Sequence, residues 1–213
     1  LNAAGAIMTA LWHRRRTGQG QFIDLALSEG PVCQFGEQIV QFSRTGVQPS
    51  RIGNTHPEHA PYGCYPAAGE DQWIAICVTS DAQWASLRRL MGGPDWAMSA
   101  ELDRGASRVR RRAELDDALG GWTSAQEPRE LAARLQAQGI AAGAVLNNRQ
   151  LLDDPHLGER GFFVEIDEPD LGVKRYPGQA IRMSADPARD WTPSPVLGEH
   201  TREVLGDLLG FAD

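Results

Sequence analysis

The residues best suited to chemistry gather between Gly53 and Cys64, in a stretch rich in proline, glycine and histidine. His56 and His59, with Cys64 close by, first suggest a metal site. Pro57 argues against it, because it disrupts the helical geometry that an H-x-x-H pair uses, and no tight cysteine cluster adds ligands. A loop or substrate role is therefore favoured, and glycine at position 53 lets backbone N–H groups approach an anion closely.

Other motifs with a chemical meaning are weaker. The run around Ser28 lacks the glycine two residues earlier that a nucleophile elbow needs, so an α/β-hydrolase is disfavoured. No phosphate-binding P-loop is present, and Gly18-Gln-Gly20 follows a predicted helix rather than a strand, which excludes a dinucleotide fingerprint. Lys174 is the only lysine available for a Schiff base, and its setting is typical of an exposed turn or strand edge.

Composition narrows the class further. The net charge of -7 disfavours general nucleic-acid binding, which depends on neutralising phosphates. No apolar run has the length of a membrane span, and the first residues do not read as a signal peptide. The three cysteines are odd in number and widely spaced, which suits reduced thiols in the cytoplasm better than disulfides. A chain that opens inside a helical pattern is expected to be a fragment, a processed product or one part of a longer protein.

The first fifty residues show an α/β pattern. A helix is expected over residues 3–13, with Arg14 to Arg16 in its last turn, where cations suit the helix dipole. Gly18 and Gly20 then permit a tight reversal into a largely buried strand over residues 22–27. Ser28 can cap the following helix, which would run toward Gly46.

A small α+β domain is expected over about residues 61–145. Strands are predicted at 73–78 and 140–146, and a helix capped by Ser80 or Asp81 should end at Gly92-Gly93. Another helix carries Leu115, Leu119 and Trp122, and Ser124 to Glu127 fits a capping box for the next one. The arginines at 14–16 and 108–112 can contact the phosphates of a ligand, although a solvated helix end is the preferred interpretation of each. The tail is expected to hold strands at 162–166, 173–176 and 181–183 and a helix at 201–209, with His200 fixing the helix entry.

Several of these segments, in this order, resemble the family III CoA-transferases of the CaiB/BaiF group. They are the helix leading into Arg16-Thr-Gly-Gln-Gly-Gln21, the segment Phe22 to Glu29, Gly53-Asn54, Ala60-Pro-Tyr62, the Trp73 strand with its Trp84 helix, Gln138 to Val145, Asp154-Pro-His-Leu157, and Gly198-Glu-His-Thr with Leu208-Leu-Gly210. Each is weak alone, but their common order along the whole chain makes the resemblance fairly specific.

The resemblance implies an α/β fold: part of a Rossmann-like large domain plus a small α+β domain, from an interlocked homodimer. Residues 1–52 would then end the first half of the large domain. Residues 53–150 would form the linker and the small domain, and residues 151–213 would return to the large domain. The partner that completes this fold would carry the missing N-terminal half.

The activity implied is CoA transfer from an acyl-CoA donor to a small carboxylic acid, through an acyl-aspartyl anhydride and an enzyme thioester. The nucleophilic aspartate of the family precedes this chain, so none of these residues is assigned as catalytic, Asp24 included, and the chain alone is expected to be inactive. The resemblance makes Gly53, Asn54, Thr55, His56 and His59 a substrate loop without the glycine run of formate/oxalate members, which disfavours oxalate. CoA and acyl-CoA act as substrates, and neither a metal nor a permanently bound cofactor is expected.

Two alternatives remain open. The α-methylacyl-CoA racemases, or a hydratase-like activity, use the same scaffold, but Ser80 stands near the position of a glutamate that racemases use. The chain can also be a non-catalytic partner subunit or fragment that completes the fold of another polypeptide. The sequence leaves the acyl donor and the acceptor acid open.

Overall fold

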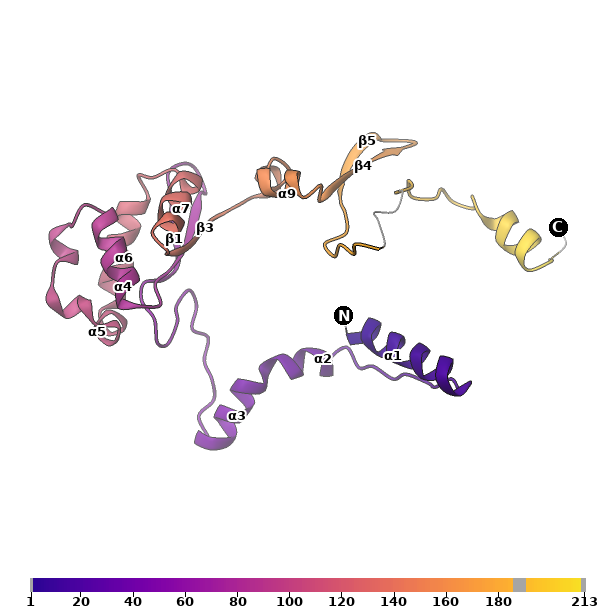
Figure 1. Ribbon diagram of the computed structural model, residues 1–213, viewed down its shortest axis with the longest axis horizontal. Coiled ribbons are helices and arrows are strands. Elements are labelled where there is room, and N and C mark those ends of the chain that lie inside the picture. The colour runs from indigo at the N-terminus through magenta and orange to yellow at the C-terminus, as the bar shows by residue number, and fades with distance from the viewer. Residues whose placement is uncertain (1, 186–190, 212–213) are drawn as a thin grey trace. The chain divides into compact units, whose positions relative to one another are not determined.

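The computed structural model describes residues 2–185 and 191–211, and the chain divides into two compact units (Figure 1). The first unit comprises residues 1–53 and the second residues 54–213. The elements are mixed α and β, as the sequence predicts. No helix in the described ranges is both long enough and apolar enough to cross a membrane.

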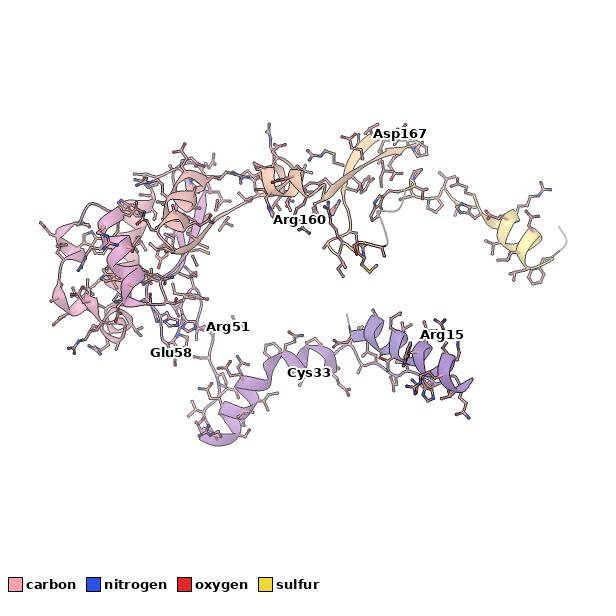
Figure 2. All side chains as sticks on the ribbon, viewed as in Figure 1. Arg15, Cys33, Arg51, Glu58, Arg160 and Asp167 are labelled. Atoms are coloured by element: carbon pink, nitrogen blue, oxygen red, sulfur yellow. The ribbon has the colours of Figure 1, made fainter. Side chains whose placement is uncertain are left out.

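The first unit is helical. It contains α1 (Asn2–Thr17), α2 (Glu29–Val32), the short helix η1 (Cys33–Phe35) and α3 (Gly36–Thr45). Glycines in the left-handed conformation follow α1 and α3, Gly18 with φ of 76° and Gly46 with φ of 67°, because only glycine adopts this geometry without strain. No described residue of this unit is buried, and side chains such as Arg15 and Cys33 are exposed (Figure 2).

The strand expected over residues 22–27 is not formed. Phe22 is 91% exposed and Leu27 is 88% exposed, and the segment is irregular. A strand requires hydrogen bonds from a neighbour, and no described residue pairs with this segment. The prediction of a side-chain cap by Ser28 is also wrong, because Ser28 precedes α2 in a helical conformation and its hydroxyl makes no capping bond.

The second unit is built on a three-stranded antiparallel sheet in the order β1-β2-β3. Its strands are β1 (Tyr62–Pro66), β2 (Trp73–Cys77) and β3 (Ala141–Val145), and the last two confirm sequence predictions. Tyr65 faces Ile74 across the first pair, and Ile76 faces Ala142 across the second. Because alternate residues point to opposite faces, these apolar side chains share the face that is buried.

Helices complete this core. They are α4 (Asp81–Leu90), α5 (Gly105–Arg110), α6 (Arg112–Thr123) and α7 (Pro128–Ala137), with short turns η2 (Asp95–Ala97) and η3 (Ala100–Asp103). α6 contacts β1, and α7 contacts β2 and β3. Trp84 and Leu87 from α4, Leu119 from α6 and Leu131 from α7 are among the side chains buried there. Two glycines with positive φ, Gly92 and Gly93, end α4 as the sequence predicts.

The helix starts test the capping predictions. Ser80 caps α4 as expected, because its hydroxyl oxygen accepts the N–H of Gln83 at 3.2 Å. The capping box predicted at Ser124 is wrong. Glu127 is the capping residue of α7, and its carboxylate accepts the N–H of Glu130 at 2.7 Å, with Pro128 in the first turn.

The remainder of the second unit contains small elements: α8 (Asn148–Leu152), α9 (Pro155–Glu159), the hairpin of β4 (Phe163–Glu168) and β5 (Gly172–Pro177), and the π-helical η4 (Arg202–Leu208). The hairpin and the last helix lie where the sequence places them. The strand expected at 181–183 is absent, because only Met183 makes an isolated bridge. Asp154 caps α9 and forms an ion pair with Arg129 at 3.0 Å.

Candidate functional site

The segment before β1 is tied to that strand by one side chain. The amide nitrogen of Asn54 donates to the carbonyl of Cys64 at 2.8 Å, and the N–H of Cys64 donates to the amide oxygen of Asn54 at 2.7 Å. The neighbouring Gly63 makes this approach possible, because a Cβ there would lie 2.8 Å from the Asn54 backbone oxygen. Asn54 thus fixes the start of the loop against the edge of the sheet.

The two histidines of this loop are stacked on one another. Their ring centroids lie 4.6 Å apart with an interplanar angle of 22°, and the ring of Tyr62 lies 4.8 Å from that of His56. Nδ1 of His56 accepts the N–H of Glu58 at 3.1 Å. Because Nδ1 is the acceptor in this bond, Nε2 is the ring nitrogen of His56 that is left to donate.

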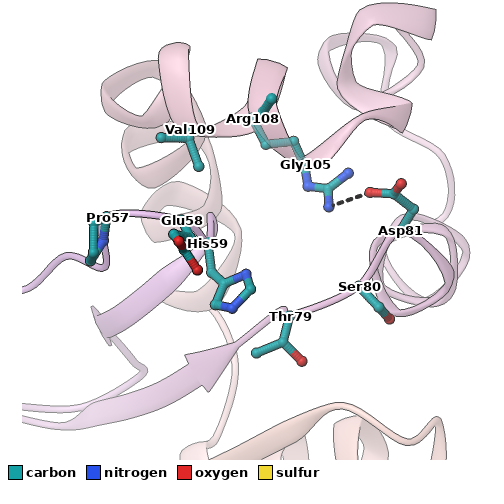
Figure 3. Close-up of a pocket in the computed structure, with 10 residues that line it drawn as sticks. Pro57, Glu58, His59, Thr79, Ser80, Asp81, Gly105, Arg108 and Val109 are labelled. Carbon is teal, nitrogen blue, oxygen red and sulfur yellow. Dashed lines mark hydrogen bonds and ion pairs between the residues drawn. The ribbon is translucent and has the colours of Figure 1, made fainter.

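A pocket of about 640 Å³ opens beside this loop (Figure 3). Pro57, Glu58 and His59 form its wall on the loop side, and the start of α4 and one side of α5 form the remainder. The His59 imidazole points toward Thr79, and the Asp81 carboxylate points toward the Arg108 guanidinium (Figure 3). The polar groups that meet here are an imidazole, hydroxyls of Thr79 and Ser80, two carboxylates and one guanidinium.

Arg108 of α5 is the most buried charged group of the pocket, with only 2% of the residue exposed. Its guanidinium donates to the carbonyls of Ala60 and Leu102 at 3.0 and 2.8 Å and to the Asp81 carboxylate at 2.7 Å. Its carbon also lies 5.6 Å from the centre of the Trp84 ring. These contacts satisfy a charge that would otherwise be costly to bury. The prediction of a solvated helix end is therefore wrong for this arginine.

Arg112, the first residue of α6, also contacts this loop. Its Nη2 donates to the carbonyls of His56 and of His59, the latter at 3.3 Å. Asp116, one turn along α6, accepts a hydrogen bond from the Tyr65 hydroxyl at 2.7 Å. Burial raises the pKa of Asp116, although the Tyr65 hydrogen bond and the Arg112 charge act in the opposite direction. Burial likewise raises the pKa of Tyr65, and the Asp116 contact adds to it.

The predicted loop residues thus occupy different places. His59 lines the pocket, His56 stacks on the ring of His59, and Asn54 forms hydrogen bonds with β1. Thr55 is half-buried, and Gly53, which belongs to the first unit, has φ of 60°, a conformation that suits glycine. In the described ranges no cluster of three or more histidine, cysteine or acidic residues is arranged to hold a metal ion.

From the sequence, Arg108 and Arg112 are named only as part of an arginine run that can contact phosphates, and Asp81 only as an alternative helix cap. None of the three is assigned a place at the pocket or the loop. Five arginines occur between positions 104 and 112, and nothing in their spacing marks the one that is buried. The three cysteines are free thiols; Cys33 and Cys64 are exposed, and burial raises the pKa of Cys77 despite a hydrogen bond with Tyr62.

Comparisons with known proteins agree along the whole chain. A family profile described as CoA-transferase family III matches residues 1–201. The succinyl-CoA–D-citramalate CoA-transferase of Chloroflexus aurantiacus is 34% identical over 212 residues, which cover 99% of this chain and 52% of that protein. The formyl-CoA:oxalate CoA-transferase of Bradyrhizobium sp. is 29% identical over 233 residues, with coverages of 100% and 55%.

The fold comparison points the same way. The crystal structure of a CaiB/BaiF family protein from Brucella suis matches with a TM-score of 0.81 and 30% identity, over 95% of this chain and 52% of that one. The chain spans about half the length of the curated relatives it matches.

Proposed function

The chain belongs to CoA-transferase family III, and from this membership we propose that the protein containing it transfers CoA from an acyl-CoA donor to a small carboxylic acid. The observation that carries the proposal within this chain is the stacked pair of His56 and His59 at a pocket whose wall includes His59. Imidazole N–H groups fixed in this way are suitable donors to a substrate carboxylate.

The reaction we propose is covalent and proceeds in balanced steps. An enzyme carboxylate, supplied from outside these residues, attacks the thioester carbonyl, so that a mixed anhydride forms and CoA thiolate leaves. The thiolate attacks the enzyme carbonyl of the anhydride, which releases the donor acid and leaves an enzyme thioester. The acceptor carboxylate then attacks the enzyme thioester, so that a second mixed anhydride forms and CoA thiolate leaves. The thiolate attacks the acceptor carbonyl of this anhydride, which gives the new acyl-CoA and regenerates the enzyme carboxylate.

The loop of residues 54–59 would serve the acceptor half of this reaction. The acceptor is an anion before it reacts, and a second carboxylate on the same molecule needs a donor that remains in place throughout. His59 offers such a donor in the pocket and His56 supports it by stacking. Proteins named for citramalate and mesaconate are 34% and 33% identical to this chain, against 29% for one named for oxalate. We therefore propose a dicarboxylic acceptor with a longer carbon skeleton than oxalate.

The wider assembly is part of the same proposal. We expect an interlocked homodimer in the cytoplasm, in which the missing half of the large domain packs against the apolar side chains of residues 2–53. Ile7, Leu11, Val40 and Phe42 are exposed in this unit, which supports such packing. Racemase chemistry is less well supported, because Ser80 is occupied as the cap of α4, and an assay of proton exchange at the acyl α-carbon distinguishes it.

Native mass spectrometry with and without acyl-CoA tests the proposal. The purified protein should contain further polypeptide beyond the 23.3 kDa of these residues and should gain an acyl or CoA adduct when the donor is added. A panel of mono- and dicarboxylic acids then identifies the acceptor by the new thioester formed. A bare 23.3 kDa species that never acquires an adduct would contradict the transferase and favour a non-catalytic subunit.

A further inference from the structure

We propose that Arg112 is a positioning residue for the acceptor site, because it fixes the loop of residues 54–60 through main-chain carbonyls and thereby sets the positions of both imidazoles. Arg108 supports the end of the same loop through the carbonyl of Ala60. This inference rests on the function proposed above for the loop. Arg112 itself touches no reacting atom in the proposal and acts only through His56 and His59.

The carbonyl contacts are the first step of the argument. Arg112 bonds to the carbonyls of His56 and His59, and Arg108 bonds to the carbonyl of Ala60. The carbonyl groups of an irregular segment have no partners in a regular helix or sheet. Hydrogen-bond donors from other parts of the chain therefore determine the conformation of the segment. The carbonyl of each histidine and its imidazole belong to the same residue. A bond to the carbonyl therefore restricts where the ring can lie.

The two arginines differ in what else they do. Arg108 is buried and also binds Leu102 and Asp81, so its loss would disturb the core as well as the loop. Arg112 is half-buried, and the hydrogen bonds of its guanidinium to described residues go to the loop. Its Nε is buried without a hydrogen-bond partner in the part of the chain that the structure describes. Arg112 is therefore the position at which the loop can be released with least damage to the fold.

Asp116 lies one turn after Arg112 on α6. The Arg112 charge acts electrostatically on this carboxyl, which the Tyr65 hydroxyl holds from the core side of β1. The hydrogen bonds of the Arg112 guanidinium go to the loop carbonyls, and these bonds favour one placement of the side chain. The Tyr65–Asp116 hydrogen bond thus joins β1 to α6, the helix that carries Arg112 to the loop.

The test compares Arg112→Gln and Arg112→Lys with Arg111→Gln in the full-length protein. Arg111 is the adjacent arginine, but its partners are Glu101 and Glu114 and not the loop. Hydrogen exchange of the segment 54–62 is followed by mass spectrometry, with the segment 73–90 as the internal reference. In Arg112→Gln the loop should exchange about tenfold faster or more, while the reference segment stays unchanged. The Arg112→Lys variant retains a cationic donor and should recover part of the protection.

Steady-state kinetics give the second readout. Arg112→Gln should raise the KM for the acceptor acid about tenfold and leave the KM for the acyl-CoA donor within about twofold, and Arg111→Gln should change neither. Unchanged loop exchange, or an equal increase in both segments, would overturn the positioning role. If the wild-type protein forms no new thioester with any acid, the proposed function fails, and the exchange measurement still decides whether Arg112 fixes the loop.

Discussion

The side-chain amide of Asn54 supplies to the edge of β1 the pair of hydrogen bonds that a neighbouring strand would give. It does so by both donating to and accepting from the backbone of Cys64. Asn54 also lies close to the residue that precedes Cys64 in the strand, and this residue must be small. Gly63 is that residue, since a Cβ there would lie 2.8 Å from both the amide nitrogen and the backbone oxygen of Asn54.

Gly63→Ala should therefore destabilise the second unit by about 1–3 kcal/mol, because a backbone oxygen has to move to admit the new methyl group. Gly143→Ala is the matched control, in β3 of the same sheet, where a Cβ would meet nothing within 4 Å. Its effect should stay within about 0.5 kcal/mol. Denaturant unfolding of both variants gives the comparison, and equal losses would contradict the close approach of Asn54.

Asp116 predicts a specific pH dependence of stability. Burial raises its pKa above the ordinary value of 3.8, so the folded protein binds this proton more tightly than the unfolded chain. The free energy of unfolding should therefore fall, through this group, as the pH rises from about 3.8 through the raised pKa. Asp116→Asn removes this dependence and keeps an oxygen that accepts from Tyr65.

The measurement is the free energy of unfolding of wild type and Asp116→Asn from about pH 3, below the ordinary pKa of 3.8, up to about pH 7. The stability of the variant relative to wild type should increase as the pH rises through that window and then level off. Asp117→Asn, at an exposed position on the same helix, controls for the loss of one negative charge. A relative stability that decreases with rising pH would show that the Arg112 charge, rather than burial, dominates.

At the scale of secondary structure, α4 and α7 show how a cap can be read correctly or not from sequence. Ser80 is followed directly by an amphipathic run, and its hydroxyl caps α4. Ser124 also precedes such a run, yet α6 continues to Thr123 and the Ser124 hydroxyl bonds back to the carbonyl of Gly121 at 2.9 Å. The cap of α7 falls three residues later, on Glu127, where Pro128 fits the first turn.

Ser80→Ala should cost about 1 kcal/mol in the free energy of unfolding, which is typical for the loss of an N-cap. Ser124→Ala should change it by less than about 0.5 kcal/mol, since the exposed hydroxyl caps no helix start. Both are measured by denaturant unfolding under the same conditions. A larger loss for Ser124→Ala than for Ser80→Ala would restore the capping box that the sequence suggests.

Local sequence patterns predict most helices and strands of the second unit. They fail where contacts between residues distant in the sequence determine the structure. The strands β2 and β3, the helices α4 and α6 and the hairpin of β4 and β5 follow from periodicity and turn residues, because each has a regular local pattern that its neighbours reinforce. The segment 22–27 has a strand pattern but no partner among the described residues. Arg108 is indistinguishable from its neighbours in sequence, since its burial depends on Ala60 and Leu102.

At the scale of the whole molecule, the two units differ in how they are stabilised. No described residue between Asn2 and Gly53 is buried, while the second unit encloses Trp84, Ile74, Leu119 and other side chains. Helices of this length are marginal in water without tertiary packing. We therefore expect the stability of α1 and α3 to come from apolar surfaces that these residues do not themselves provide.

Expressed as residues 1–213 alone, the chain should show backbone amides in α1 and α3 that exchange at least about tenfold faster than those in α4 and α7. Addition of the proposed further half should slow exchange in α1 and α3 and leave α4 and α7 nearly unchanged. Hydrogen exchange measured by mass spectrometry on both preparations makes the comparison. Equal protection of all four helices in the isolated chain would show that the first unit is stable by itself.

The carbonyl contacts made by Arg108 and Arg112 also have a consequence for how such an enzyme can evolve. Every amino acid carries the same carbonyl, so substitutions at positions 56 and 59 leave the anchoring groups in place. Side chains at these positions are thus free to diversify while the path of the main chain is inherited. Variant libraries that randomise them and retain both arginines would be a direct way to redirect the proposed transferase toward new acids.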